Sequence, residues 1–253
     1  MKTIHALVAG AALSTAASMS SAAVIFADNF DSYANNAAMQ AVWGAAGAGA
    51  LSNNQSFSPT QSMFHPGGTV NSIAIAPSGP TVTDNLFLSV KIYDDGLNAN
   101  KRLTLGLRTG AGTIFEVGFY NQANAAAYAA RYLLPGVSPT PAGSSAYETI
   151  GPSAALAAVA GWHTFTALFS LNSVTVTLDI GSDGSGIVSD TFSLNGTPYT
   201  FNDLRIGGPS GVSSGGGGGY FDDVLLQTVP VPEPASLGLL ALGGMMLGRR
   251  RRA

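Results

Sequence analysis

Between residues 86 and 178 the chain repeatedly alternates apolar and polar positions with a period of two. Alternation of this kind, rich in Val, Ile, Thr, Phe and Tyr, predicts β-strands that bury one face. The predicted strands cover residues 86–92, 103–107, 114–120, 162–169 and 174–178. Gly, Asp and Asn cluster between them, as is typical of tight turns. We therefore expect an all-β domain.

Closely spaced strands joined by such turns indicate an antiparallel β-sandwich, in the form of a jelly roll. A doubly wound α/β sheet would need amphipathic crossover helices, and the pattern contains none. The one helical candidate, residues 153–160, is short and rich in alanine. Residues 34–50 are mostly small and residues 121–134 could form either a strand or a helix, so the structure of both stretches stays open.

The first 23 residues have the pattern of a secretory signal peptide. Lys2 and His5 precede an apolar stretch at residues 6–13, and small residues follow as far as Ala23. Cleavage after Ala22 or Ala23 would give a mature chain that begins near residue 24. The predicted β-sandwich domain then spans residues 24–229.

Residues 230–253 form a second terminal segment, in which a Pro-Glu-Pro triplet is followed by an apolar run at 235–248 and four arginines. As a helix the run would be only about 21 Å long. Because the hydrocarbon core of a bilayer is about 30 Å thick, the run suits a temporary membrane anchor better than a permanent one. The arginines place the C-terminus in the cytoplasm and the preceding domain across the membrane. A plain tail anchor with a basic stop-transfer signal is the alternative.

This segment closely resembles the PEP-CTERM sorting signal of Gram-negative bacteria. The matching residues are Pro232, Glu233 and Pro234 for the triplet and Arg249, Arg250, Arg251 and Arg252 for the arginine cluster. The resemblance implies recognition by an exosortase, a membrane sorting enzyme that cuts near the triplet. It also implies a precursor anchored transiently in the inner membrane, then a place at the cell surface or in the extracellular matrix, among exopolysaccharide and biofilm.

The charge of the mature region changes the choice of partner. Residues 24–230 contain six cations and thirteen carboxylates, a net charge of −7. A nucleic-acid partner is therefore not expected, because such binding depends on Lys and Arg that neutralise phosphates. The chain has no cysteine, so a disulfide framework is excluded. The stability of the fold must come from the buried core, and a bound ion could add to it.

Three short motifs, at residues 28–31, 161–163 and 220–225, resemble those of concanavalin A-like and carbohydrate-binding jelly-roll domains. In such domains the first and last strands are neighbours, and acidic residues of both often hold a structural calcium ion. The resemblance implies that Asp28 or Asp31 lies beside Asp222 or Asp223 as calcium ligands, since calcium takes oxygen ligands. Successive side chains of a strand point to opposite faces, so at most one of Asp222 and Asp223 joins the site. The alternative is that these acids are solvated residues of strand edges.

Catalytic residues are not expected. Glycoside hydrolysis needs two carboxylates about 5–9 Å apart. The Glu-x-Asp-x-x-Glu strand of concanavalin-like glucanases is absent, and Glu116 and Glu148 are the only glutamates of the mature region. His65 and His163 are too far apart in sequence for a metal-binding motif. An enzyme that acts on polysaccharide is a distant alternative.

Binding of a glycan is easier to support, because sugar faces stack on aromatic rings while carboxylates and amides accept hydroxyl groups. Tyr93, Tyr120 and Glu116 are the candidate ligand-binding residues, whereas Trp43 and Trp162 are expected to anchor the core. Two functions stay open: a carbohydrate-binding protein of the exopolysaccharide, or a structural or surface-display matrix protein without sugar binding. A cluster of exposed aromatic rings on one sheet face would favour the first.

Overall fold

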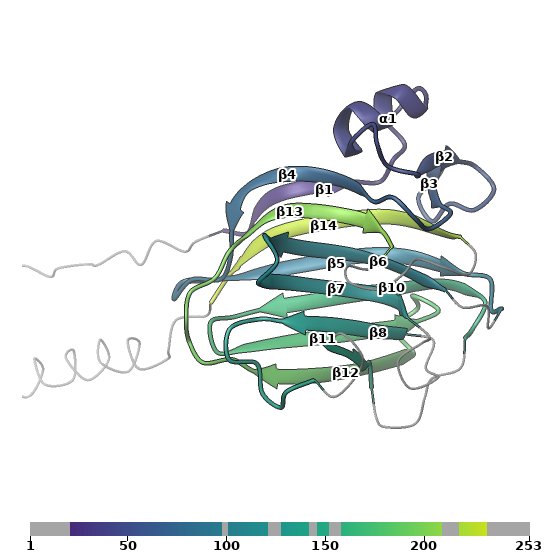
Figure 1. The fold of residues 1–253 in the computed structure, drawn as a ribbon. Helices are drawn as coiled ribbons and strands as arrows, with labels where there is room; N and C mark the ends of the chain where they lie inside the picture. Colours follow the sequence, from purple (N-terminus) through teal and green to yellow (C-terminus); the bar gives the residue numbers. More distant parts are fainter. Residues whose placement is uncertain are drawn as a thin grey trace, which may run out of the picture.

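The computed structural model describes residues 21–97, 101–120, 128–141, 146–151, 158–208 and 218–231. Within them the chain forms two antiparallel β-sheets that face each other, as the sequence predicted (Figure 1). Most of the predicted signal peptide, the sorting signal from residue 232 and most of the helical candidate at 153–160 lie outside these residues. No helix in the described part of the chain is long and apolar enough to cross a membrane.

The larger sheet has eight strands in the order β12-β11-β10-β5-β14-β3-β2, with β1 also paired to β14. They are β1 (Ala23–Asp28), β2 (Ala50–Ser52), β3 (Ser62–His65), β5 (Asp84–Asp94), β10 (Gly161–Phe169), β11 (Ser173–Ile180), β12 (Gly186–Ser193) and β14 (Gly219–Pro230). On one edge β14 pairs with β5, and on the other it pairs first with β3 and then with β1. The first and last strands are thus neighbours, as the jelly-roll resemblance implied.

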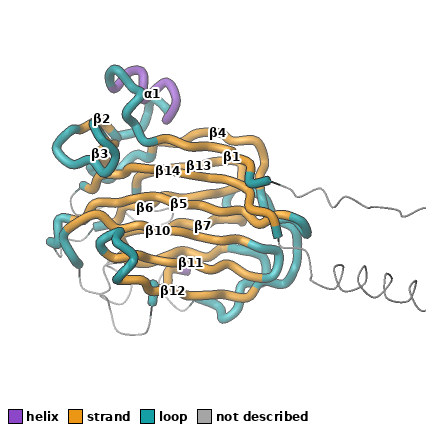
Figure 2. Tube along the Cα trace, turned by 180° about the vertical axis from the view of Figure 1, so that it is seen from behind, coloured by secondary structure: helices purple, strands orange, loops and turns teal. Residues whose placement is uncertain are grey.

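The smaller sheet has six strands in the order β4-β13-β6-β7-β8-β9. They are β4 (Asn71–Ser78), β6 (Arg102–Thr109), β7 (Thr113–Tyr120), β8 (Tyr128–Leu133), β9 (Tyr147–Thr149) and β13 (Phe201–Gly207). The helix α1 (Asn36–Trp43) lies with β2 and β3 at one edge of the sandwich, seen from both sides in Figures 1 and 2.

The five predicted strands are confirmed and lie in β5, β6, β7, β10 and β11. The two stretches that the sequence left open now have a structure where it is described. Residues 34–50 contain α1, whose N-terminus is capped by the Asn35 side chain accepting a hydrogen bond of 3.0 Å from the Ala38 amide. Residues 128–133 form β8.

The core lies between the sheets and is rich in aromatic rings. Phe169 and Phe165 of β10 contact Phe115 and Phe119 of β7 edge-on, with ring centroids 4.8 and 6.3 Å apart. All four rings are buried. Each contributes about 1.5–3 kcal/mol by leaving water. Because these rings occupy the inner face of each sheet, the alternate residues of the same strands point outward.

Candidate functional site

Four aromatic side chains form a row across neighbouring strands of the larger sheet. Trp162 of β10 is in register with Tyr93 of β5, Tyr93 with Tyr220 of β14, and Tyr220 with Phe64 of β3. Successive ring centroids are 5.6, 5.9 and 5.0 Å apart. All four side chains are half-buried, so part of each ring reaches solvent.

The alternation of β5 and β10 explains why this row faces outward. Val90 and Ile92 of β5 are fully buried in the core, so Tyr93 points to the opposite face of the sheet. In β10 the buried residues are out of phase with Trp162. Trp162 is therefore not a core anchor, contrary to expectation, whereas Trp43 is fully buried as expected.

A fifth ring, Phe57, reaches the row from the loop between β2 and β3. Its side chain is 44% exposed and lies edge-on to Trp162 with centroids 6.0 Å apart. The Lys91 ammonium lies 3.7 Å from the Phe57 ring centroid and donates a hydrogen bond of 3.1 Å to the Thr164 hydroxyl. The aromatic patch is defined here as Phe57, Phe64, Tyr93, Trp162 and Tyr220.

Asp222 holds the loop that carries Phe57. Its carboxylate accepts hydrogen bonds from the Phe57 amide at 2.8 Å and from the amide and hydroxyl of Ser58 at 3.0 and 2.9 Å. Burial raises the pKa of Asp222, and these hydrogen bonds oppose the rise. The position of Phe57 is thus fixed by a buried carboxylate of β14.

A pocket of about 290 Å³ lies beside the aromatic row. It is lined by Gln55, Phe64, Tyr93, Asp95, Gly218 and Tyr220. Three aromatic rings therefore share one pocket with an amide and a carboxylate side chain. The exposed lining is more polar than apolar, and the volume is near the lower end of the usual range of about 300–1,000 Å³ for small-molecule sites.

The four aspartates proposed as calcium ligands lie near the point where β14 exchanges β3 for β1. Asp28 is opposite Val224, and the register of β14 against β5 shifts between Asp222 and Leu225. Asp223 lies within this irregularity and has a left-handed backbone, with φ of 46°. The structure therefore brings acidic residues of the first and last strands together, as the resemblance implied.

Asp28, Asp31 and Asp222 nevertheless accept hydrogen bonds from separate protein donors. Asp28 accepts hydrogen bonds from the Trp43 indole at 2.7 Å, the Tyr33 hydroxyl at 2.5 Å and the Phe30 amide at 2.7 Å. Asp31 accepts from the amides of Thr60 and Gln61 at 3.1 and 3.0 Å. Burial would raise the pKa of Asp31, but hydrogen bonds from the Thr60 side chain and from both amides outweigh it and lower the value.

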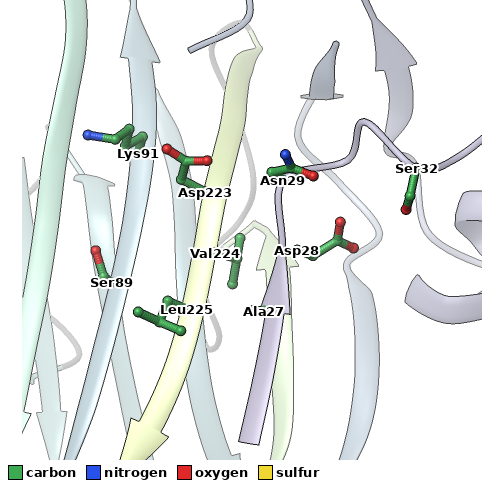
Figure 3. A pocket seen from close by; sticks show the side chains of 9 residues that line it. All are labelled: Ala27, Asp28, Asn29, Ser32, Ser89, Lys91, Asp223, Val224 and Leu225. Carbon is green, nitrogen blue, oxygen red and sulfur yellow. The ribbon is translucent and has the colours of Figure 1, made fainter. Parts of the chain in front are cut away.

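A calcium ion needs about six to eight oxygens that converge on one point. The Asp28 and Asp223 carboxylates point away from each other (Figure 3). No group of three or more acidic or histidine side chains in the described part of the chain could hold a metal ion. The four aspartates therefore do not fit a calcium site in this arrangement.

A second pocket, of about 470 Å³, lies beside Asp223 (Figure 3). It is lined by Ala27, Asp28, Asn29, Ser32, Ser89, Lys91, Asp223, Val224 and Leu225. The Asp223 carboxylate extends from β14 towards β5, where Ser89 and Lys91 lie (Figure 3). Burial, followed by the neighbouring charge of Asp222, raises the pKa of Asp223.

The three predicted ligand-binding residues are divided between the sheets. Tyr93 belongs to the aromatic patch, whereas Tyr120 and Glu116 are buried in β7 of the smaller sheet. Tyr120 stacks on Tyr147 with centroids 4.0 Å apart. Glu116 accepts hydrogen bonds from the Tyr147 hydroxyl at 2.5 Å and from Arg131 at 3.4 Å. Tyr120 and Glu116 thus belong to a separate buried cluster.

Sequence reasoning missed most of the aromatic patch. The outward position of Trp162 could have been predicted, because Trp162 alternates in phase with Thr164 and Thr166, the polar residues of the same strand. For Tyr220 the shift in register near Asp222 obscures the phase. Phe57 lies in a loop, where alternation carries no information.

The chain matches the PEP-CTERM protein-sorting motif at residues 230–252. This match confirms the sorting signal and includes the Pro-Glu-Pro triplet and the arginine cluster. It indicates an exported precursor that is processed by an exosortase and sorted to the surface.

The comparison with curated proteins found no match. Among solved structures, the T. cruzi calreticulin globular domain is similar at 11% identity and a TM-score of 0.47, covering 81% of this chain and 87% of that one. Domain 4 of an extracellular GH43 arabinanase from Geobacillus stearothermophilus, in complex with arabinotriose, has 13% identity, a TM-score of 0.45 and coverage of 74% and 78%. An endo-1,3-beta-glucanase from Streptomyces sioyaensis has 13% identity, a TM-score of 0.44 and coverage of 83% and 97%.

Proposed function

We propose that the exported protein binds a glycan of the cell's own exopolysaccharide through the aromatic patch, without catalysis. The observation that carries the proposal is the row of Trp162, Tyr93, Tyr220 and Phe64 in register across four neighbouring strands. Half-buried rings next to one another form an apolar surface of a kind that marks binding sites. Tyr and Trp are also the residues that most often dominate the energy of binding.

The pocket beside the row supports a ligand that is both apolar and polar. Sugar rings present C–H faces that stack on aromatic rings and hydroxyl groups that need hydrogen-bond partners. Phe64, Tyr93 and Tyr220 provide aromatic rings on which a sugar can stack. Gln55 and Asp95 provide hydrogen-bond partners for its hydroxyl groups. The geometry therefore suits a sugar better than a purely apolar molecule.

The place of the aromatic patch agrees with display at a surface. Tyr220 is near the start of β14, and Pro230, its last residue, is also the first residue of the sorting motif. Ten residues of strand separate them by about 33 Å. Ala23, the first residue of β1, pairs with Thr228 at the same end as Pro230. A precursor held in the membrane by residues 235–248 would thus carry the aromatic patch at its far end.

Binding without catalysis is supported by the surroundings of Glu116. A glycosidase needs a second carboxylate across a cleft. The hydrogen-bond partners of Glu116 include the Arg131 guanidinium and the Tyr147 hydroxyl. Glu116 is itself only 1% exposed. These contacts suit an internal ion pair, and we expect no hydrolysis of the bound glycan.

The test is equilibrium binding of the protein, purified from the producing cells after export, to the exopolysaccharide of those cells. Tyr93→Ala and Trp162→Ala are each expected to weaken binding by about tenfold or more, since loss of a central aromatic side chain typically costs about 2 kcal/mol. Leu168→Ala is the control, because Leu168 lies on the same strand as Trp162 and is 37% exposed.

Each outcome of this experiment decides between the functions. Loss of binding in both aromatic variants with unchanged affinity in the Leu168 variant supports the proposal. Saturable binding that survives both aromatic substitutions would place the site elsewhere. No binding by the unaltered protein would favour a structural or surface-display role in the matrix.

A further inference from the structure

The two pockets lie on the same face of the larger sheet and follow the same pair of strands. The first is lined by Tyr93 of β5 and Tyr220 of β14, and the second by Ser89 of β5 and Leu225 of β14. Tyr93 and Ser89 are four positions apart on β5, a distance of about 13 Å. A single sugar ring cannot fill both pockets, whereas a chain of several rings can.

The loop that carries Phe57 lies between the two pockets, because it covers Asp222, which is fully buried and pairs with Lys91 of β5. Lys91 lies on β5 between Ser89 and Tyr93 and also lines the second pocket. Its ammonium is held near the Phe57 ring at 3.7 Å, and Phe57 in turn contacts Trp162. The exposed Phe57 ring therefore forms the surface between the two pockets.

Asp223 gives the second pocket a free hydrogen-bond acceptor. Among the described residues, no side chain or amide donates a hydrogen bond to its carboxylate, unlike those of Asp28, Asp31 and Asp222. Its left-handed backbone, with φ of 46°, costs about 1–2 kcal/mol in a residue other than glycine. Backbone strain of this kind is concentrated at functional sites, and here it accompanies a carboxylate directed into a pocket.

The charges that line the pockets select the kind of ligand. Asp28 and Asp223 line the second pocket and Asp95 lines the first, while Lys91 is the one cation among the described lining residues of both. Carboxylates accept hydrogen bonds from hydroxyl and amino groups and repel other carboxylates. A glycan with acidic groups is therefore disfavoured along this surface.

We propose that both pockets and the Phe57 ring between them bind one extended polysaccharide chain without acidic groups, which passes over Phe57 and donates a hydrogen bond to Asp223. This proposal rests on the proposed function and specifies its ligand: an internal stretch of several sugar units, neutral or amino-bearing, in place of a single terminal sugar.

The experiment measures the dissociation constant for neutral oligosaccharides of increasing length, prepared from the bound glycan or from a neutral glucan that the protein binds. For the unaltered protein the affinity is expected to rise by about tenfold or more once an oligosaccharide reaches from Tyr93 to Ser89. Ser89→Tyr fills the second pocket and should abolish this rise while leaving the affinity for a disaccharide within about twofold. Ser189→Tyr is the matched control, since Ser189 is exposed on β12.

Asp223→Asn tests the selection by charge, and asparagine tolerates the left-handed backbone. It is expected to increase binding of an acidic oligosaccharide, an oligogalacturonate, by about threefold or more. Affinity that does not depend on length, with the disaccharide still bound, would overturn this inference and leave the proposed function intact. Equal binding of neutral and acidic chains by the unaltered protein would overturn the charge selection. Absence of binding at every length would overturn both proposals.

Discussion

Asp28 either binds a metal ion or serves only as an internal hydrogen-bond acceptor, and substitution of this residue distinguishes the two roles. It lies at the end of β1 and accepts three hydrogen bonds, from Trp43 at 2.7 Å, Tyr33 at 2.5 Å and Phe30 at 2.7 Å. Trp43 is fully buried in α1. Asp28 therefore ties the helix to the first strand.

Asp28→Ala would leave the buried Trp43 indole without its acceptor. A hydrogen bond to a charged group contributes about 1.5–3 kcal/mol, and an unsatisfied buried donor costs about 1–3 kcal/mol. Water can reach Tyr33, which is only half-buried, so the three losses will not add fully. We expect Asp28→Ala to lower the free energy of unfolding by about 3–5 kcal/mol. For a domain of this size that corresponds to about 6–20 °C in Tm.

The assay is thermal and urea unfolding in the presence of calcium or of a chelator. Asp28→Asn should cost less than Asp28→Ala, because its amide oxygen can still accept from Trp43. If Asp28 instead bound calcium with a Kd of about 10 μM, 1 mM calcium would stabilise the unaltered protein by about 2.7 kcal/mol. A calcium-dependent rise in Tm that disappears in Asp28→Ala would refute the internal role, as would a loss of less than about 1 kcal/mol on that substitution.

Three further predictions concern other buried groups. Burial lowers the pKa of His65 from 6.5 to about 4, so the unfolded chain takes up the proton at a higher pH than the folded protein does. The free energy of unfolding should therefore fall by about 3 kcal/mol as the pH drops from 6.5 to about 4. Urea unfolding at several pH values should show a smaller fall for His65→Gln. Asp222→Ala removes the acceptor of the loop amides and should cost about 2–4 kcal/mol by the same assay, whereas Asp183→Ala on an exposed turn should leave Tm almost unchanged. Gly118→Ala should lower the free energy of unfolding by at least about 2 kcal/mol, because φ is 146° and the added methyl group would lie 2.5 Å from a backbone oxygen of β6. Gly112→Ala is the control, since its methyl group meets open space and should leave Tm nearly unchanged.

The fold class could be predicted because the central strands alternate without interruption. β5 buries every second side chain from Leu86 to Asp94, and β10 does the same from His163 to Phe169. A half-buried antiparallel strand imposes this period on the sequence, so the period reveals the strand. The order of the strands in each sheet could not be predicted, since alternation reports which face is buried and not which strand is the neighbour.

The elements that the sequence left open lack this regular pattern. In α1 only Met39 and Trp43 are buried. Two apolar positions one turn apart, among small residues, are too few to show a helical period in the sequence. β8 is buried on both faces, and Tyr, Ala and Arg occupy it in no order that favours a strand. Burial on both faces removes the alternation from which a strand is recognised.

The acidic residues show where reasoning from a motif ends. The jelly-roll resemblance implied that Asp28 or Asp31 lies beside Asp222 or Asp223, because the first and last strands are neighbours, and β1 does pair with β14 with Asp28 opposite Val224. Whether such carboxylates hold a metal depends on what else can satisfy them. Here Asp31 and Asp222 accept from four backbone amides of the loop at residues 57–61, which any sequence would provide, and Asp28 accepts from Trp43, Tyr33 and Phe30. A motif records the acceptors but not the donors, so only Asp223, which this loop does not reach, is left to meet a ligand.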